Sequence, residues 1–227
     1  MEYVEIARAE SERGELVLRE RRDANGPTSL ELRANGVFVM DTVEVATERA
    51  LAAAALEAVE TPTAVVVGGL GLGFTMHEVL ADSRVEKVAV VEIEQALVDW
   101  MRDATIPHGP ALLADDRVSV VVANIAVALA EAPPASYDLV LLDVDNGPGY
   151  LVHDANAVLY EAPFLESARR ALRTGGALAI WSAAPAPDLL RSLTAVFGDA
   201  HGYGHDVLLQ DREETYWLYV ARVPSQA

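Results

Sequence analysis

The chain has 227 residues, no cysteine and a formal net charge of −18. Its hydrophobic content of 52% suits one domain of ordinary size, or a domain with a small appendage. No window approaches the roughly 18 uninterrupted apolar residues of a membrane span, and the acidic balance disfavours nucleic acid, because phosphates need cationic partners. The first 15 residues are charged and lack an apolar signal core. We therefore expect a cytoplasmic enzyme without membrane or nucleic-acid partners.

The first forty residues show short alternating patterns typical of strands, at 14–22, 28–34 and 37–40. Asn35-Gly36 separates two of them, and this dipeptide favours a type I′ hairpin because both of its residues accept positive φ. We predict a small antiparallel β domain over residues 1–42.

From residue 43 onward a helix at 45–59 is followed by alternating strands and helices. The expected strands are 63–67, 88–92, 118–122, 137–143, 176–182, 205–211 and 215–222. The expected helices are 74–82, 94–104, 125–131, 156–173 and 186–197. The helix at 156–173 is expected to start or bend at Pro163 and to be capped by Gly175-Gly176.

The strands from residue 63 onward are nearly continuous apolar runs, which indicates a parallel sheet covered by helices on both faces. Only three residues separate the last two strands, so these must form an antiparallel hairpin at one edge. We predict an α/β fold for residues 43–227, with a doubly wound, mostly parallel, seven-stranded sheet. This is the outline of the class I methyltransferase fold.

The stretch VVVGGLGLGFTMHEVL (65–80) predicts a strand, a glycine-rich turn and a helix. Gly69, Gly71 and Gly73 allow a tight turn and the close approach of a ligand to the main chain. Glu92 ends the next strand, 19 positions after Gly73, where an acidic side chain can accept the hydroxyl protons of a ribose. No basic residue near the loop serves a phosphate, so the loop fits S-adenosylmethionine (SAM) better than a dinucleotide.

At this point the residues resemble the spermidine synthase family. The resemblance rests on the segments 32–52, 65–80, 85–94, 115–124 and 137–148. It implies SAM or decarboxylated SAM as the co-substrate and no metal. The cofactor site it implies consists of Gly69, Gly71, Gly73, Glu92, Ile93, Asn124 and Ile125. Asp143 takes the position of the catalytic aspartate.

The chain departs from the family pattern at several positions. Leu72 stands where the family places an aspartate that holds the amine of decarboxylated SAM. The segment 46–52 keeps Glu48 but lacks the family's tyrosine and histidine. Asn124 replaces an aspartate at the adenine, and its carbonyl oxygen can still accept from the adenine amino group.

A carboxylate at the carboxyl end of a strand lies where ligands bind in open α/β sheets, so Asp143 is the expected proton acceptor or orienting group, and Asp145 could share that role. Asp-x-Asp-Asn-Gly-Pro is also turn chemistry, which we favour for Asn146 and Gly147. The acceptor is expected to contact Tyr150, Tyr160 and Glu48. We expect His77, His153, Trp181 and Leu70 to be surface or packing residues.

Three functions remain open. Leu72 favours methyl transfer from SAM to a small molecule, possibly an amine. The overall resemblance and Asp143 also fit an aminopropyltransferase that makes spermidine or a related polyamine. A catalytically idle SAM-fold binding protein is the third reading. Members of the family associate through the N-terminal sheet, so we expect a homodimer.

Overall fold

The computed structural model describes residues 2–22, 28–209 and 212–225. A four-stranded antiparallel sheet comes first, in the order β1-β2-β3-β4. Its strands are β1 (Glu2–Ser11), β2 (Gly14–Arg22), β3 (Ser29–Ala34) and β4 (Val37–Asp41). The hairpin at Asn35-Gly36 is confirmed, with φ values of 51° and 76°. Strand β1 was not predicted, because most of its side chains are exposed and its sequence shows no regular apolar alternation.

The second sheet has seven strands in the order β10-β11-β9-β8-β5-β6-β7. The strands are β5 (Ala64–Gly68), β6 (Lys87–Glu92), β7 (Val118–Val122), β8 (Tyr137–Leu142), β9 (Leu172–Ser182), β10 (Asp199–Leu209) and β11 (Arg212–Arg222). Strands β5 to β9 pair in parallel, whereas β11 is antiparallel to both β9 and β10. The predicted seven-stranded sheet and its edge hairpin are confirmed.

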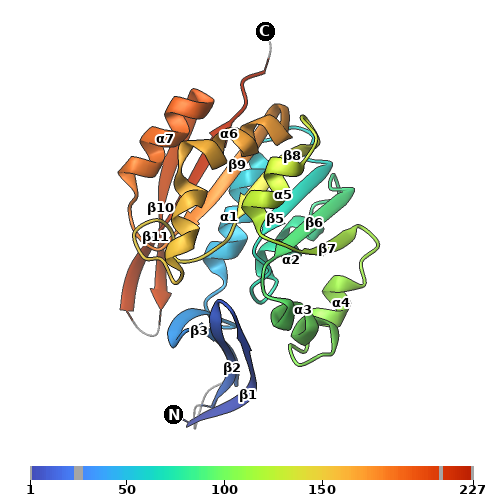
Figure 1. The fold of residues 1–227 in the computed structure, drawn as a ribbon, viewed down its shortest axis with the longest axis vertical. Coiled ribbons are helices and arrows are strands. Elements are labelled where there is room, and N and C mark those ends of the chain that lie inside the picture. The colour runs from blue at the N-terminus through green and yellow to red at the C-terminus, as the bar shows by residue number, and fades with distance from the viewer. Residues whose placement is uncertain (1, 23–27, 210–211, 226–227) are drawn as a thin grey trace.

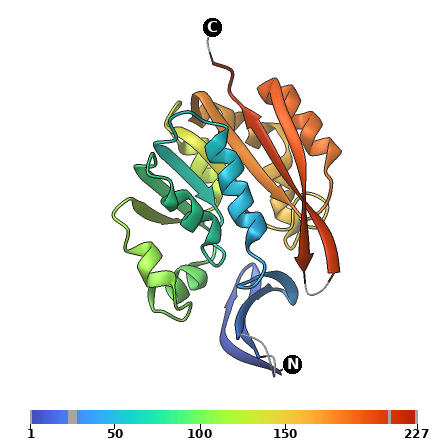
Figure 2. The ribbon, with the colours of Figure 1, turned by 180° about the vertical axis from the view of Figure 1, so that it is seen from behind.

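Helices cover both faces of this sheet. They are α1 (Ala46–Glu57), α2 (Phe74–Ala81), α3 (Gln95–Arg102), α4 (Gly109–Leu113), α5 (Ile125–Glu131), α6 (Ala162–Ala171) and α7 (Pro187–Phe197), with a 3₁₀ segment at Asp154–Tyr160. Figure 1 shows α5, α6 and α7 in front of the sheet, and Figure 2 shows α1, α2 and α3 on the opposite face. Each layer has its own hydrophobic cluster against the sheet. No helix within the described ranges is long and apolar enough to cross a membrane.

The region before β9 differs from the prediction. The expected helix at 156–173 is two segments, and Pro163 lies in the first turn of the second, α6. The prediction that Gly175-Gly176 caps this helix is wrong, because α6 ends at Ala171 and β9 begins directly at Leu172. Gly175 lies inside β9 with a φ of 80°, where the pairing with β8 shifts register. A bulged strand needs such a residue, since glycine accepts positive φ without strain.

Two further differences concern edges of the sheet. Strand β10 starts at Asp199, ahead of the expected start at residue 205. Strand β7 forms the other edge and is largely exposed, with Val121 and Val122 each more than 40% accessible. The expectation that every strand is buried on both faces therefore fails at β7.

The topology places a crevice at the carboxyl ends of the parallel strands. Strand β5 pairs with β6 on one side and with β8 on the other. The connection after β5 leads to β6, and the connection after β8 leads to β9 on the opposite side of the sheet, so the strand order reverses between β5 and β8. Ligands of open α/β sheets bind at such a switch point. The N-terminal sheet lies at this same end, below the larger sheet in Figure 1.

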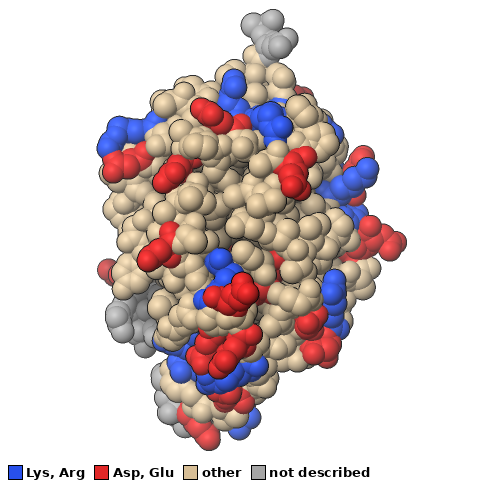
Figure 3. All heavy atoms as spheres, viewed as in Figure 1, with Lys and Arg blue, Asp and Glu red and all other residues tan. Residues whose placement is uncertain are grey.

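The proposed domain boundary at 42/43 falls between β4 and α1. One hydrophobic cluster nevertheless runs across it, from Leu18 and Leu32 of the small sheet to Leu51 of α1 and Val67 of β5. Figure 3 shows acidic and basic side chains interspersed over the N-terminal sheet at the bottom of the view. The net negative charge therefore forms no single-sign patch over the N-terminal sheet on this face.

Candidate active site

The glycine loop joins β5 to α2 and runs against the end of β8. Gly69, Gly71 and Gly73 have φ values of 92°, 49° and 86°, which side chains rarely adopt. A Cβ on Gly69 would lie 2.1 Å from the carbonyl oxygen of Asp143, and one on Gly71 would lie 2.7 Å from Met40 Sδ. Glycine is therefore required here by the protein's own packing as well as by backbone conformation.

A cavity opens beside this loop, and we call it the glycine-loop cavity. Six of the predicted cofactor residues line it: Gly69, Gly71, Glu92, Ile93, Asn124 and Ile125. Gly73 does not line it, because it begins α2 and packs near Leu112 and Met101. The sequence prediction thus brings together residues from the ends of β5, β6 and β7 around one hollow.

Glu92 is 7% exposed at the end of β6. The backbone N–H of Leu70 donates to Oε2 and that of Glu94 donates to Oε1, each at 2.8 Å. Burial raises the pKa of Glu92, and these backbone donors oppose the rise. Each carboxylate oxygen accepts more than one hydrogen bond, so Glu92 is fixed in place and still able to accept from two hydroxyl groups.

Asn124 follows β7 and is the N-cap of α5. Its Oδ1 accepts from the backbone N–H of Ala126 at 2.8 Å. This contact uses one lone pair of the carbonyl oxygen that was expected to meet an adenine amino group, and leaves the other lone pair for a ligand.

Asp143 follows β8 and also lines the glycine-loop cavity. Its backbone N–H donates to the carbonyl of Gly68 at 2.9 Å, which ties the ends of β8 and β5 together. Thr75 Oγ1 of α2 donates to its Oδ2 at 2.5 Å. Burial raises the pKa of Asp143, and the Thr75 hydrogen bond opposes that rise.

Asp145 holds the loop that follows β8. Its Oδ1 accepts from the backbone N–H groups of Asn146 and Val152, and its Oδ2 accepts from the backbone N–H of His153 and from the Asn156 side chain. Its φ is 63°, in the left-handed region. Four donors occupy this carboxylate, so it holds residues 145–156 in place and has less capacity left for a ligand than the expected shared catalytic role would need.

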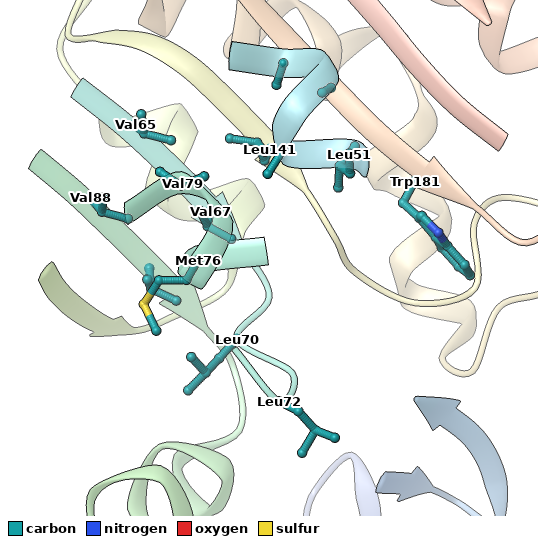
Figure 4. Packing of buried hydrophobic residues seen from close by; sticks show 14 of the residues in the cluster. Leu51, Val65, Val67, Leu70, Leu72, Met76, Val79, Val88, Leu141 and Trp181 are labelled. Atoms are coloured by element: carbon teal, nitrogen blue, oxygen red, sulfur yellow. The ribbon is translucent and has the colours of Figure 1, made fainter. Parts of the chain in front are cut away.

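Two leucines separate the glycines, and Figure 4 draws their side chains pointing away from each other. Leu70 is 4% exposed and packs in the core, as expected. Leu72 is fully buried in the same cluster and lines neither of the two cavities described here. Its backbone N–H contacts Met40 Sδ at 3.2 Å, and its carbonyl oxygen lies 2.6 Å from His108 Nε2.

A second hollow lies between the N-terminal sheet, α1 and β11, and we call it the acidic cavity. Four carboxylic acids line it: Asp41, Glu44, Glu48 and Glu214. Four aromatic side chains line it as well: Phe38, Tyr150, Trp181 and Tyr216. No Lys, Arg or His lines it among the residues whose side chains are described, 2–22, 28–207 and 213–225. Carboxylates and aromatic faces together attract organic cations.

Glu48 lies in the first turn of α1 and is 8% exposed. Burial, followed by the nearby charge of Asp143, raises the pKa of Glu48 to about 7. Val39 lines both cavities, so the two hollows adjoin at β4. The acids of the two cavities therefore act on each other electrostatically.

The aromatic predictions have mixed outcomes. Tyr150 lines the acidic cavity and is 66% exposed. Tyr160 lines neither cavity, because it is buried and its hydroxyl donates to the carbonyl of Val144 at 3.0 Å. Trp181 packs in the core, as expected, and one side of it also lines the acidic cavity, next to Tyr216 with ring centroids 4.9 Å apart.

Arg13 and His153 are among the residues that line the glycine-loop cavity without having been predicted from the sequence. Arg13, from the β1–β2 turn, places its Nε 3.2 Å from Glu94 Oε1. His153 was expected at the surface but lines the cavity, where burial and then Arg13 lower its pKa. Neither has a sequence signal, because both lie in turns whose position depends on the assembled fold. Within the described ranges no three acidic, histidine or cysteine residues form a metal-binding group, and the absence of a metal stays a prediction.

Comparison with known proteins matches residues 44–187 to the spermine/spermidine synthase domain. Putrescine N-methyltransferase 3 of Nicotiana tabacum is 33% identical over 121 residues, which are 53% of this chain and 30% of that protein. Polyamine aminopropyltransferase 2 of Pseudomonas aeruginosa is 30% identical over 160 residues, which are 66% of this chain and 44% of that protein. The chain thus spans less than half the length of these curated relatives.

Solved structures show the same fold. A spermidine synthase in complex with the transition state analogue AdoDATO superposes with a TM-score of 0.82 at 19% identity, covering 96% of this chain and 73% of that one. The spermidine synthase of Thermotoga maritima gives a TM-score of 0.80 at 19% identity, covering 96% and 72%. Because the family model matches more than half of this chain, the chain belongs to the spermine/spermidine synthase family.

Proposed function

We propose that the protein is a SAM-dependent transferase that methylates a small amine. The donor occupies the glycine-loop cavity and the acceptor occupies the acidic cavity. The family membership and the relatives named putrescine N-methyltransferase support this proposal. The observation that carries the choice of methyl transfer is the burial of Leu72.

The glycine-loop cavity fits an adenosyl group. Glu92 is held so that it can accept from the ribose hydroxyls, Ile93 and Ile125 offer apolar walls for a flat ring, and Asn124 offers an acceptor for an amino group. When bound, the sulfonium of SAM supplies an electrophilic carbon. The chain's own contribution is to hold that carbon in line with the acceptor nitrogen and to exclude water.

The acidic cavity fits the acceptor. An ammonium group gains from the carboxylates of Glu44, Glu48 and Glu214 and from the faces of Trp181 and Tyr216. The four acids would repel an anionic acceptor, and a neutral acceptor would gain less from them than a cation does. We infer an amine acceptor from this composition.

Leu72 separates methyl transfer from aminopropyl transfer. A donor with a terminal ammonium needs a carboxylate near the glycine loop, and position 72 supplies a fully buried apolar side chain that lines neither cavity. An ammonium left there without a partner would be costly to desolvate. Ordinary SAM carries the same ammonium next to its own carboxylate, which partly balances the charge, so SAM depends less on a protein carboxylate at position 72.

The test incubates the protein with SAM or decarboxylated SAM and a panel of mono-, di- and polyamines, and identifies the products by mass spectrometry. We expect S-adenosylhomocysteine and a methylated amine with SAM, and no product with decarboxylated SAM. Methylthioadenosine with an enlarged polyamine would show aminopropyl transfer instead, which the similarity to polyamine aminopropyltransferase 2 makes the second candidate. The absence of both products, together with no thermal shift from any adenosyl ligand, would support the catalytically idle reading.

The remaining expectations stay proposals. These are the division into residues 1–42 and 43–227, a homodimer formed through the N-terminal sheet, and a cytoplasmic location. Sedimentation of the full chain would test the oligomeric state.

A further inference from the structure

We propose that Glu48 is the residue that takes the proton from the acceptor amine, and that Asp143 positions the reacting groups from the other side. This inference rests on the proposed amine-transferase function, and it holds for methyl and for aminopropyl transfer alike. It assigns to Glu48 a chemical role, beyond a contact with the acceptor.

Glu48 faces the acceptor side of the site. It lines the acidic cavity, and Asp143 lines the glycine-loop cavity. Thr47 Oγ1 donates to Glu48 Oε2 at 2.9 Å, and among the described residues no other residue's donor reaches its carboxylate. The backbone N–H of Glu48 itself also donates to this carboxylate. Because each carboxylate oxygen can accept more than one hydrogen bond, Glu48 retains acceptor capacity for an N–H of the acceptor. The first turn of α1 fixes the side chain, since Thr47 and Glu48 are both buried.

Asp143 is less suited to that proton. Its Oδ2 already accepts the hydroxyl of Thr75 at 2.5 Å, and its main chain is tied to the glycine loop. A residue fixed in this way can hold the reacting carbon and nitrogen in line. It also influences Glu48, because its negative charge opposes ionisation of the neighbouring acid.

The groups around Glu48 come from four elements. Asp143 faces it from the end of β8, Glu44 from the segment before α1, Asp41 from β4, and Glu214 and Tyr216 from β11. Arg21 pairs with Asp41 at 3.5 Å but does not line the acidic cavity. Burial, and then the charge of Asp143, raise the pKa of Glu48 to about 7. At neutral pH part of this group is therefore ionised, and the carboxylate is basic enough to accept a proton.

One proton and two electron pairs move in this reaction. The bound ammonium gives one proton to the Glu48 carboxylate, which leaves a neutral amine nitrogen with a lone pair. This lone pair forms the new N–C bond as the C–S bond breaks, and the electron pair of that bond stays on sulfur. The acceptor nitrogen, now bearing the new carbon, carries the positive charge, and Glu48 returns its proton to solvent through the open acidic cavity.

The test is the pH dependence of kcat/KM for the full chain, with the amine acceptor found for the wild-type protein. We expect the wild-type rate to rise with pH through about 7, as Glu48 ionises. Glu48→Gln should lower kcat/KM about 100-fold and remove this rising limb. Glu48→Asp, which keeps a titrating carboxyl, should retain a rising limb at a reduced rate, and it serves as the test if Glu48→Gln does not fold.

Two matched variants separate this role from the general acidity of the cavity. Glu44→Gln removes a neighbouring carboxylate and should raise KM while the rising limb remains. Asp143→Asn should slow the reaction and move the limb to lower pH, because Glu48 loses a negative neighbour. Loss of the limb in Asp143→Asn and its survival in Glu48→Gln would overturn the proposal and make Asp143 the proton acceptor.

The two proposals fail in different ways. No product from the wild-type chain with any donor and amine would reject the proposed function itself. Product formation with an unchanged pH profile in Glu48→Gln would leave the function intact and reject the assignment to Glu48.

Discussion

Glu48 is a carboxylic acid that folding removes from water, and no cation lines the cavity beside it among the side chains of residues 2–22, 28–207 and 213–225. The folded state therefore favours its neutral form, and its pKa rises from 4.5 to about 7. A group whose pKa is raised by folding contributes stability that is fully present below its pKa in the unfolded chain. This stability is lost as the pH rises through its pKa in the folded protein. Above about pH 7 the ionised acid destabilises the protein.

The raised pKa predicts the effect of Glu48→Gln on stability. Glutamine resembles the neutral acid, so the variant should be more stable than the wild-type protein at pH 8, on the order of 2 kcal/mol, and nearly equal to it at pH 4.5. Urea unfolding at the two pH values measures the difference. Glu57→Gln is the control, because Glu57 is exposed at the end of the same helix and its replacement should change little at either pH. An equal gain at both pH values would contradict the assigned cause.

Leu72 gives a second prediction for a single residue. Leu72→Asp places a charge among fully buried apolar side chains, so we expect a loss of several kcal/mol in the free energy of unfolding. Leu72→Met, which nearly conserves volume, should cost less than about 1.5 kcal/mol. Thermal unfolding in the absence of ligand compares the two. A stable Leu72→Asp variant with new affinity for decarboxylated SAM would show that position 72 faces the donor after all.

At the scale of elements, the glycine loop is held by the strand next to it. Gly69→Ala would bring a methyl group against the carbonyl of Asp143 at a backbone conformation that alanine resists. Gly36→Ala is a matched control, because Gly36 also has positive φ but nothing within 4 Å of its added Cβ. We expect Gly36→Ala to cost about 1 kcal/mol and Gly69→Ala to cost more and to abolish binding of an adenosyl ligand, measured by calorimetry. Equal costs with binding retained would show that the loop adapts.

The elements also show what could be predicted from the sequence. Strands β5, β6 and β8 are apolar runs with clear ends, so the sequence alone places Glu92 and Asp143 at the carboxyl edge of the sheet. Strand β1 could not be predicted, because it is held by pairing with β2 and buries little of its own surface. Gly175-Gly176 suggested a helix cap, yet positive φ serves a strand bulge equally well. Local sequence indicates the conformation and does not say which element uses it.

At the scale of the whole molecule, the N-terminal sheet completes the site that the larger sheet begins. Leu16, Leu32 and Val39 of the small sheet line the glycine-loop cavity, together with Arg13. None of these contacts follows from local pattern, since they depend on how the two sheets meet. This is why the sequence predicted the cofactor residues of the parallel strands and missed those of the N-terminal turn.

Arg13 therefore allows a test of how the two sheets cooperate. Its guanidinium pairs with Glu94 and donates to Asn156 Oδ1 at 3.4 Å, so it links the β1–β2 turn to both sides of the glycine-loop cavity. Arg13→Ala should raise the Kd for an adenosyl ligand roughly fivefold, about 1 kcal/mol, because Glu94 loses its partner and the turn loses its anchor. Arg8→Ala is the matched control, since Arg8 lies on β1 of the same hairpin and pairs only with partly exposed Glu5 and Glu15 among the described residues. Calorimetry should show a change for Arg13→Ala alone. Equal affinities for the two variants would mean that the N-terminal turn covers the cavity without helping to hold its ligand.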